Sequence, residues 1–371
     1  MEAMELNSTF WLDKRVLVTG HTGFKGAWLT LLLNQLGANV VGVSDKVVPT
    51  NCIWSDFFES ENYKKSLTSH SLIDLRDYAT LAHRISEVQP DIVFHLAAQP
   101  LVLDSYLHPE ATWEVNVQGT VNLLRSIGMI SKSVSIVIVT TDKVYKDNRL
   151  KAKYVEGDEI GGSDPYSASK SAVEFLVSSW RAALDSRNSQ TDRKISISTA
   201  RAGNVIGGGD FSSQRIIPDL VRSLTNQRPL QLRLPNAVRP WQHVLEPLMG
   251  YLQLAQFQSL TPNFKGEAFN FGPVNHKLIT VGELVSRASS LWGSQPEITL
   301  NSKSAHESDY LDLCSSKADT VLKWRPILTL DEVLGMTMEW YKQNANGARP
   351  YQLCIQQIEY YCNHPNFHSR L

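Results

Sequence analysis

Tyr166 and Lys170 are the two residues whose types and spacing most directly indicate chemistry. They stand four positions apart at the start of an expected helix, Ser167–Leu184, so the phenol and the ammonium share one helix face. A nearby cation favours the phenolate, and we therefore expect a lowered pKa and a role as a base for Tyr166. A Tyr-x-x-x-Lys spacing also arises by chance in a chain with 12 tyrosines, so the interpretation depends on where the pair lies in the fold.

Thr141, Asp142 and Lys143 stand where an expected apolar strand, Val134–Thr141, ends. Active groups of doubly wound sheets gather beyond the carboxyl ends of strands. Thr141 could bond the same reacting oxygen that Tyr166 deprotonates, and Asp142 with Lys143 would add an acid/base pair beside it. The alternative is a strand-ending turn with solvated charges.

The segment GHTGFKG places Gly20, Gly23 and Gly26 between an expected strand, Lys14–Thr19, and an expected helix, Ala27–Leu36. Glycines permit a tight turn and close approach of a pyrophosphate, while a helix N-terminus offers unpaired N–H groups. Glycine-rich turns often serve geometry alone, but this strand–turn–helix context favours a dinucleotide site.

Two acids could select the cofactor. Asp45 follows the expected strand Asn39–Val43, where an acid commonly accepts hydrogen bonds from the adenosine ribose. Its neighbour Lys46 could instead contact the 2′-phosphate of NADP, and Asp45 could also be a solvated loop acid. Asp74 precedes an expected helix, Asp77–Val88, and could contact adenine or cap that helix.

Short apolar strands alternate with helical stretches through the first 200 residues, which predicts an α/β fold with a Rossmann-type, doubly wound parallel sheet. After about Arg201 glycine and proline become frequent, which indicates a smaller C-terminal lobe that binds substrate. We expect residues 1–200 to form the NAD-binding domain and 201–371 mainly the substrate lobe, with some segments returning to the first domain. The expected strands not yet named are 91–96 and 194–200, and the remaining expected helix is 111–127.

Composition narrows the class of protein. The 371 residues include 36 Lys and Arg against 37 Asp and Glu, so the net charge of -1 offers no global attraction to nucleic acid or to an anionic membrane. The four cysteines lack metal-type or redox-type spacing, and no signal-like or membrane-spanning apolar run occurs. We therefore expect a cytoplasmic protein. We also expect no metal site, because the spacing of His21, His95 and His243 does not form a metal-binding set.

Seven segments together resemble the CDP-glucose 4,6-dehydratases, a family within the extended short-chain dehydrogenase/reductases. The likeness runs from about Arg15 to Trp340. The glycine turn and Tyr-x-x-x-Lys are general to the superfamily, whereas the Asp-Lys pair and RPWQHV are more selective. Relatives acting on dTDP-glucose typically carry Asp-Glu where this chain has Asp142-Lys143. The segments are GHTGFKGAWL, HLAAQP, TTDKVY, PYSASK, RAGNVIGGGD, RPWQHVLEP and HESDYLDLCSSKA.

The resemblance implies an internal redox cycle with NAD as cofactor: oxidation at sugar C4, loss of water across C5 and C6, and hydride return to C6. Tyr166 would remove the C4 hydroxyl proton with help from Thr141, and Lys170 would tune Tyr166 and bind the nicotinamide ribose. Asp142 would protonate the leaving C6 hydroxyl, and Lys143 would act as the C5 base, for which it needs a lowered pKa. The implied cofactor residues are Gly20, Thr22, Gly23, Phe24, Lys25, Gly26, Asp45, Asp74, Leu75, Leu96, Ala97, Ala98, Tyr166 and Lys170.

The substrate implied by the resemblance is a nucleotide sugar, CDP-glucose. Arg239 is the leading ligand of its pyrophosphate, because a planar guanidinium suits paired phosphate oxygens. Arg215 and Asn204 are further candidates. His306 and Tyr310 fit the family's nucleotide-binding segment, although the sequence alone would also allow an exposed loop there.

Other functions remain open at this point. A 4-epimerase has no use for the Asp142–Lys143 pair, a dehydratase could act on another nucleotide, and a silent NAD(H) sensor would not need Thr141, Tyr166 and Lys170. The resemblance also implies a homodimer through the helices at 111–127 and 167–184. The segment 352–361 predicts a short helix that extends the substrate lobe.

Overall fold

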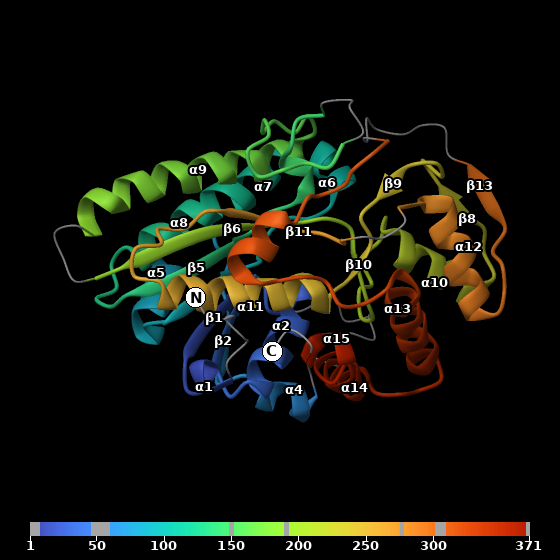
Figure 1. Ribbon diagram of the computed structural model, residues 1–371, viewed down its shortest axis with the longest axis horizontal. Coiled ribbons are helices and arrows are strands. Elements are labelled where there is room, and N and C mark those ends of the chain that lie inside the picture. Colours follow the sequence, from blue (N-terminus) through green and yellow to red (C-terminus); the bar gives the residue numbers. More distant parts are fainter. Residues whose placement is uncertain are drawn as a thin grey trace.

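The computed structural model describes residues 8–45, 60–147, 152–188, 193–274, 278–300 and 309–368 (Figure 1). Its centre is a seven-stranded sheet in the order β11-β6-β5-β4-β1-β2-β3, and every pairing is parallel. The expected α/β class with a doubly wound sheet is confirmed. The strands are β1 (Arg15–Thr19), β2 (Asn39–Ser44), β3 (Ser69–Leu72), β4 (Ile92–His95), β5 (Val134–Val139), β6 (Ile195–Ala202) and β11 (Ala268–Phe271).

Helices cover both faces of this sheet (Figure 1). One face carries α5 (Tyr78–Val88), α8 (Gly119–Ile127) and α9 (Pro165–Asn188), and the other carries α2 (Phe24–Gln35) and α11 (Leu245–Leu260). Parallel strands buried on both sides read as continuous apolar runs, and all six residues of β5 are buried.

The expected helix at 111–127 is present but is not uniform along its length. It consists of α7 (Pro109–Trp113), a wider π-helical turn at Glu114–Gln118, and α8. Shorter helical segments are α1 (Ser8–Trp11), α4 (Glu61–Lys65), α6 (Val102–Leu107), a 3₁₀ turn at Asp142–Val144 and a π turn at Ala318–Leu322.

A second region lies beyond the end of the sheet, at the right of Figure 1. It contains three two-stranded pairs and the helices α10, α12 and α13. The chain then returns to the first region, because α11 packs on β5 and β6 and because β11 pairs with β6. A domain boundary at residue 200 stays a prediction. The bounds are β7 (Val205–Ile206), β10 (Gln242–His243), β9 (Val238–Arg239), β12 (Ile279–Thr280), β8 (Leu230–Leu232), β13 (Ile298–Leu300), α10 (Ile216–Asn226), α12 (Val281–Trp292) and α13 (Leu330–Ala345).

The C-terminal segment forms α14 (Pro350–Cys362) and α15 (Pro365–His368). Helix α14 packs against α13 and also against α2, so it does more than extend the second region. Tyr361 donates from its hydroxyl to Oε2 of the buried Glu246 on α11 at 2.7 Å. Within the described residues, no helix combines the length and the apolar character needed to cross a bilayer.

Candidate active site

The glycine turn lies where the order of the sheet reverses, with β2 on one side of β1 and β4 on the other. Such a switch point opens a crevice at the carboxyl ends of the strands. Gly20 has φ of 75°, and a Cβ there would lie 2.7 Å from the backbone nitrogen of Ala97. A Cβ on Gly26 would lie 2.0 Å from the carbonyl oxygen of Gly20. The turn therefore requires glycine at both positions.

The first turn of α2 offers donors to an anion. Its N-cap residue is Gly23, which supplies no side-chain hydrogen bond to the helix end. Thr22 donates from its backbone to Ser44 Oγ at 3.2 Å, which fixes the turn against β2. Uncapped N–H groups at a helix N-terminus fit a pyrophosphate. Phe24 and Lys25, the first residues of α2, also border the cavity described below.

Asp45 is exposed directly after β2, at the same carboxyl edge of the sheet. Asp74 instead binds Arg76, whose Nη2 donates to Asp74 Oδ2 at 2.6 Å, and this bond holds the pKa of Asp74 below its usual range. The alternative that Asp74 caps α5 is wrong, because Asp77 accepts the backbone N–H of Thr80 at 3.2 Å.

The remaining cofactor residues lie near the same edge. Leu75 is buried, with its Cβ 3.0 Å from where a Cβ of Gly119 would stand. Leu96, Ala97 and Ala98 follow β4, and Ala97 donates from its backbone to Thr19 Oγ1 at 3.3 Å.

One cavity of about 430 Å³ brings together most of the polar residues singled out from the sequence. It lies between the carboxyl edge of the sheet and the second region, since its walls come from both. Segments more than 100 residues apart in the chain thus face a single space. The singled-out residues that line it are Phe24, Lys25, Thr141, Asp142, Lys143, Tyr166, Asn204, Arg215 and Arg239.

Asp142 begins the 3₁₀ turn after β5 and is buried. Thr141 donates from its hydroxyl to Asp142 Oδ1 at 3.1 Å, while Oδ2 has no hydrogen-bond partner among the described residues. Burial raises the pKa of Asp142, and the charges of Lys143, Arg239 and Lys25 oppose that rise. A carboxyl with a raised pKa and one unpaired oxygen is suited to donate a proton.

Tyr166 is half-buried on the first turn of α9, where Ser105 Oγ accepts its backbone N–H at 3.1 Å. Burial raises the pKa of its phenol to about 12, and a hydrogen bond with Thr141 opposes this only partly. The expected lowering of this pKa is therefore wrong. The ammonium of Lys170 donates to the Val139 carbonyl at 3.1 Å.

The cavity carries cationic side chains from both regions. Arg239 is buried and donates from Nη1 to the Val238 carbonyl at 2.9 Å. Arg215 donates from Nη1 to Asp210 Oδ2 at 2.7 Å. Burial, together with the charge of Arg215, lowers the pKa of Lys25 to about 7. An anion bound here would relieve the mutual repulsion of these cations.

Two residues expected at the nucleotide stand apart from this cavity. Tyr310 borders a neighbouring cavity of about 350 Å³, whose wall shares Leu234 and Ala237 with the first. His306 lies outside the described residues.

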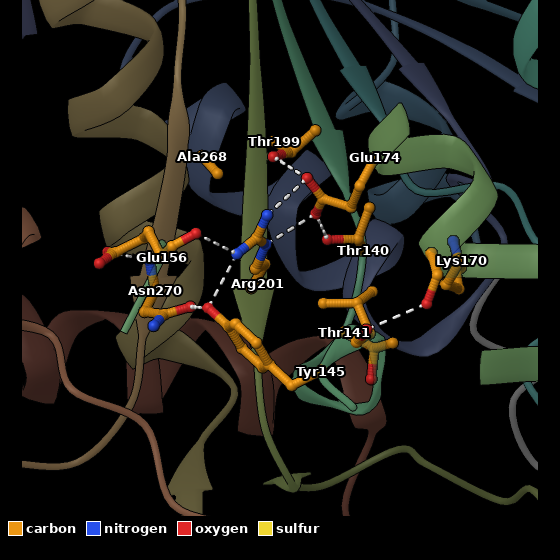
Figure 2. A network of polar contacts seen from close by, with 12 residues as sticks. Thr140, Thr141, Tyr145, Glu156, Lys170, Glu174, Thr199, Arg201, Ala268 and Asn270 are labelled. Carbon is orange, nitrogen blue, oxygen red and sulfur yellow. Dashed lines mark hydrogen bonds and ion pairs between the residues drawn. The ribbon is translucent and has the colours of Figure 1, made fainter. Parts of the chain in front are cut away.

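The structure also places residues at the site that the sequence analysis did not single out. Asp210 pairs with Arg215 on the cavity wall, and a Cβ on Gly203 would approach Asp142 Oδ2 to 2.8 Å. Behind the wall, Glu174 and Arg201 form a buried ion pair (Figure 2). The sequence feature that could have indicated this pair is the spacing of Glu174, which stands four residues after Lys170 on the same helix face.

Known proteins resemble this chain both in sequence and in structure. The family model described as GDP-mannose 4,6 dehydratase matches residues 17–337. A CDP-glucose 4,6-dehydratase of Salmonella typhimurium is 40% identical over 346 residues, which cover 92% of this chain and 94% of that protein. A dTDP-glucose 4,6-dehydratase of Shigella flexneri is 27% identical, over 92% of this chain and 98% of that protein.

Solved structures share the fold at lower identity. A UDP-glucuronic acid 4-epimerase from Bacillus cereus, in complex with UDP-glucuronic acid and NAD, superposes with a TM-score of 0.76 at 21% identity. The match covers 89% of this chain and 99% of that one. MoeE5, in complex with UDP-glucose and NAD, has a TM-score of 0.74 at 23% identity, over 89% of this chain and 99% of that one.

Proposed function

Since this chain belongs to the GDP-mannose 4,6 dehydratase family, we propose that it is an NAD-dependent hydro-lyase that converts CDP-glucose into CDP-4-dehydro-6-deoxy-glucose. The resemblance to the CDP-glucose 4,6-dehydratases predicted from the motifs is confirmed by the 40% identical relative. The observation that carries the proposal is the buried Asp142, with its raised pKa, in the same cavity as Lys143 and Tyr166. A dehydratase of this kind needs three groups around one sugar: an acid, a base and a residue that takes the hydroxyl proton during oxidation at C4.

The residues around the glycine turn fit a dinucleotide. Gly20 and Gly26 allow the turn to pack without a Cβ, and the uncapped start of α2 can bind the pyrophosphate. Asp45 stands where it can accept bonds from the adenosine ribose, which favours NAD over NADP. The residues of the glycine turn and the start of α2 would hold NAD, which would supply a hydride acceptor for C4, in its reduced form a hydride donor for C6, and the positive charge of its oxidised nicotinamide.

Tyr166 and Thr141 act at C4. Tyr166 takes the proton of the C4 hydroxyl, and Thr141 hydrogen-bonds the same oxygen. Because burial holds the pKa of the free phenol at about 12, Tyr166 needs added positive charge to act as a base. Lys170, whose ammonium lies one helical turn along α9, contributes part of that charge.

Asp142 and Lys143 act at C6 and C5. The C4 ketone acidifies the C5 hydrogen, and Lys143 removes it as a proton. Asp142 gives its own proton to the departing C6 hydroxyl, so that water leaves and a C5–C6 double bond forms. Once hydride has returned to C6, Lys143 returns a proton to C5, and the net change is the loss of one water molecule.

Arg239, with Arg215 and Asn204, would bind the substrate pyrophosphate in the same cavity. Buried guanidinium groups bind paired phosphate oxygens with two parallel hydrogen bonds. Tyr310, in the adjoining cavity, would contact the nucleoside.

A 4-epimerase is the second candidate, because the epimerase structures share this fold. An epimerase oxidises and reduces the same carbon and expels no water. It would therefore gain nothing from a protonated Asp142 beside Lys143, and the cavity favours the dehydratase.

We further propose that the protein forms a homodimer. Helices α6, α7 and α9 pack against one another and expose four large apolar side chains: Tyr106, Leu107, Trp113 and Phe175, which are 45%, 73%, 42% and 61% exposed. Apolar side chains gathered on neighbouring helices indicate a protein interface. A second copy packing through the same helices would cover them.

The test is an assay of the purified protein with CDP-glucose, dTDP-glucose, GDP-mannose and UDP-glucose. We expect a 4-keto-6-deoxy sugar from CDP-glucose, detected by its alkali-sensitive absorbance and by mass. Tyr166→Phe, purified in parallel, should lose about 10²- to 10⁴-fold in turnover. A product epimerised at C4 that keeps its 6-hydroxyl would instead identify an epimerase.

A further inference from the structure

Glu174 and Arg201 form a buried ion pair (Figure 2), and neither of them lines the cavity described above. Arg201 on β6 donates from Nε to Glu174 Oε1 at 2.9 Å and from Nη2 to Oε2 at 3.0 Å, and both side chains are only 3% exposed. Thr140 and Thr199 donate their hydroxyls to the two carboxylate oxygens at 2.6 and 2.7 Å. The carboxylate of Glu174 is thus fully hydrogen-bonded.

Such a pair contributes little net stability, because desolvating two charges costs about as much as their attraction returns. The reaction proposed above makes no direct use of either residue. The function of Glu174 and Arg201 is therefore sought in what they contact and not in the stability that they contribute.

Glu174 acts first on Lys170. The two residues are four apart on α9, so their Cβ atoms lie about 5–6 Å apart on one helix face. Burial lowers the pKa of Lys170 to about 8, and the charge of Glu174 opposes that lowering. From the other elements, Lys25 of α2 repels the ammonium, and His95 of β4 is neutral because burial lowers its pKa to about 3.

Glu174 acts secondly on the turn after β5. The hydroxyl of Thr140 is bonded to Glu174, and the next residue is Thr141, whose hydroxyl contacts both Asp142 and Tyr166. One carboxylate thereby fixes the residue that precedes the reacting groups. On the Arg201 side of the network, the hydroxyl of Tyr145 accepts a hydrogen bond from Arg201 Nη1 at 2.9 Å (Figure 2).

We propose that Glu174 is a positioning residue of this enzyme, which keeps the Lys170 ammonium charged and, through Thr140, holds Thr141 in place for the reaction at C4. The proposal rests on the dehydratase function. Its two parts, charge and position, can be separated by different variants.

The charge part is tested with the double variant E174Q/R201Q, which removes both buried charges and leaves neither unpaired. Without the carboxylate, Lys170 loses its proton at lower pH, so the alkaline limb of the kcat–pH profile should move down by about one unit or more. E174Q alone should move it in the same direction. If the folded double variant has the same kcat–pH profile as wild type, Glu174 serves only to pair with Arg201, and the charge part of the proposal is overturned.

A direct titration of Lys170 keeps this test independent of the activity. In protein carrying ¹³C-labelled lysine, the Lys170 signal is assigned by its loss in Lys170→Arg and followed against pH in wild type and E174Q/R201Q. We expect a lower midpoint in the double variant, and equal midpoints would refute the charge part. If wild type dehydrates no nucleotide sugar, the dehydratase proposal fails while this titration still reports on Glu174.

The position part is tested with T140V, which removes one hydroxyl from Glu174 and leaves every charge in place. The matched control is T199V, which removes the other hydroxyl at the far side of the same carboxylate. We expect kcat to fall about tenfold or more in T140V alone, with KM and the alkaline limb unchanged, because small misplacements of reacting groups are costly. Equal effects of the two variants, or full kcat in T140V, would overturn the position part.

Discussion

Asp142 and Lys143 are neighbours in the chain but have different surroundings, and that difference supports the separate roles proposed for them. Asp142 is buried, and its pKa is raised by that burial. Lys143 is half-buried and borders the same cavity. In the proposed reaction, a carboxyl with a raised pKa would serve as the acid for the C6 hydroxyl, and the neighbouring amine would serve as the C5 base.

The two roles predict different failures. Lys143→Ala should abolish exchange of the C5 hydrogen with deuterium from solvent and should lower product formation about 10²-fold or more. Asp142→Asn should still exchange C5 hydrogen while expelling water slowly, because a carboxamide is too weak an acid to protonate the leaving hydroxyl. Mass spectrometry of recovered substrate and product distinguishes the two.

Identical exchange in both variants would mean that proton removal and water loss are concerted. Full product formation in Lys143→Ala would exclude the base role and leave the lysine as an electrostatic neighbour of Asp142.

At the scale of residues, the sequence predicted the types of side chain at the site better than their protonation. Thr141, Asp142, Lys143, Tyr166, Arg215 and Arg239 were all expected near substrate, and all line one cavity. The prediction of a lowered pKa for Tyr166 was wrong, because a shared helix face shows which side chains are neighbours but not how deeply they are buried. The spacing of Glu174 from Lys170 was visible in the sequence, but its hydrogen bonds with Thr140, directly after β5, and with Thr199 of β6 join distant segments and were missed.

The element that positions the cofactor is the β1–turn–α2 unit. Gly26 faces the carbonyl oxygen of Gly20 so closely that no side chain fits without moving the turn. We expect Gly26→Ala to weaken NAD binding at least tenfold, since overpacking a rigid site typically costs about 1–3 kcal/mol. Calorimetric titration with NAD measures the loss.

Gly335, in the interior of α13, is the matched control for that substitution. A Cβ there meets nothing within 4 Å, so Gly335→Ala should bind NAD normally and gain about 0.5–1 kcal/mol in unfolding free energy. Normal NAD affinity in Gly26→Ala would show that the turn is not as constrained as its geometry indicates.

Elements built from local pattern were predicted well, and elements that depend on distant partners were not. Strands β1, β2, β4, β5 and β6 lie within two residues of their expected bounds, because each is an apolar run. β3 is short, polar and only half-buried at the edge of the sheet, and its four residues carry no such signal. β11 was missed because its place beside β6 is set by a pairing between segments far apart in the chain.

At the scale of the whole molecule, the exposed apolar side chains of α6, α7 and α9 predict the state of assembly. Phe175→Asp should shift the protein from dimer to monomer in sedimentation velocity, because a charge would be buried at the centre of the proposed interface. Leu300→Asp on β13 is the control, since Leu300 is also an exposed apolar side chain but lies in the second region. A wild-type monomer, or a dimer that survives Phe175→Asp, would contradict this interface.

The packing of α14 on α2 links the two ends of the described chain. Buried side chains of α14, among them Leu353, Cys354 and Ile358, share one apolar core with Leu29 of α2. During synthesis, α2 leaves the ribosome long before α14 exists, so its outer apolar surface stays uncovered until the late residues arrive. The apolar core that α2 and α14 share is therefore complete only when translation has passed α14.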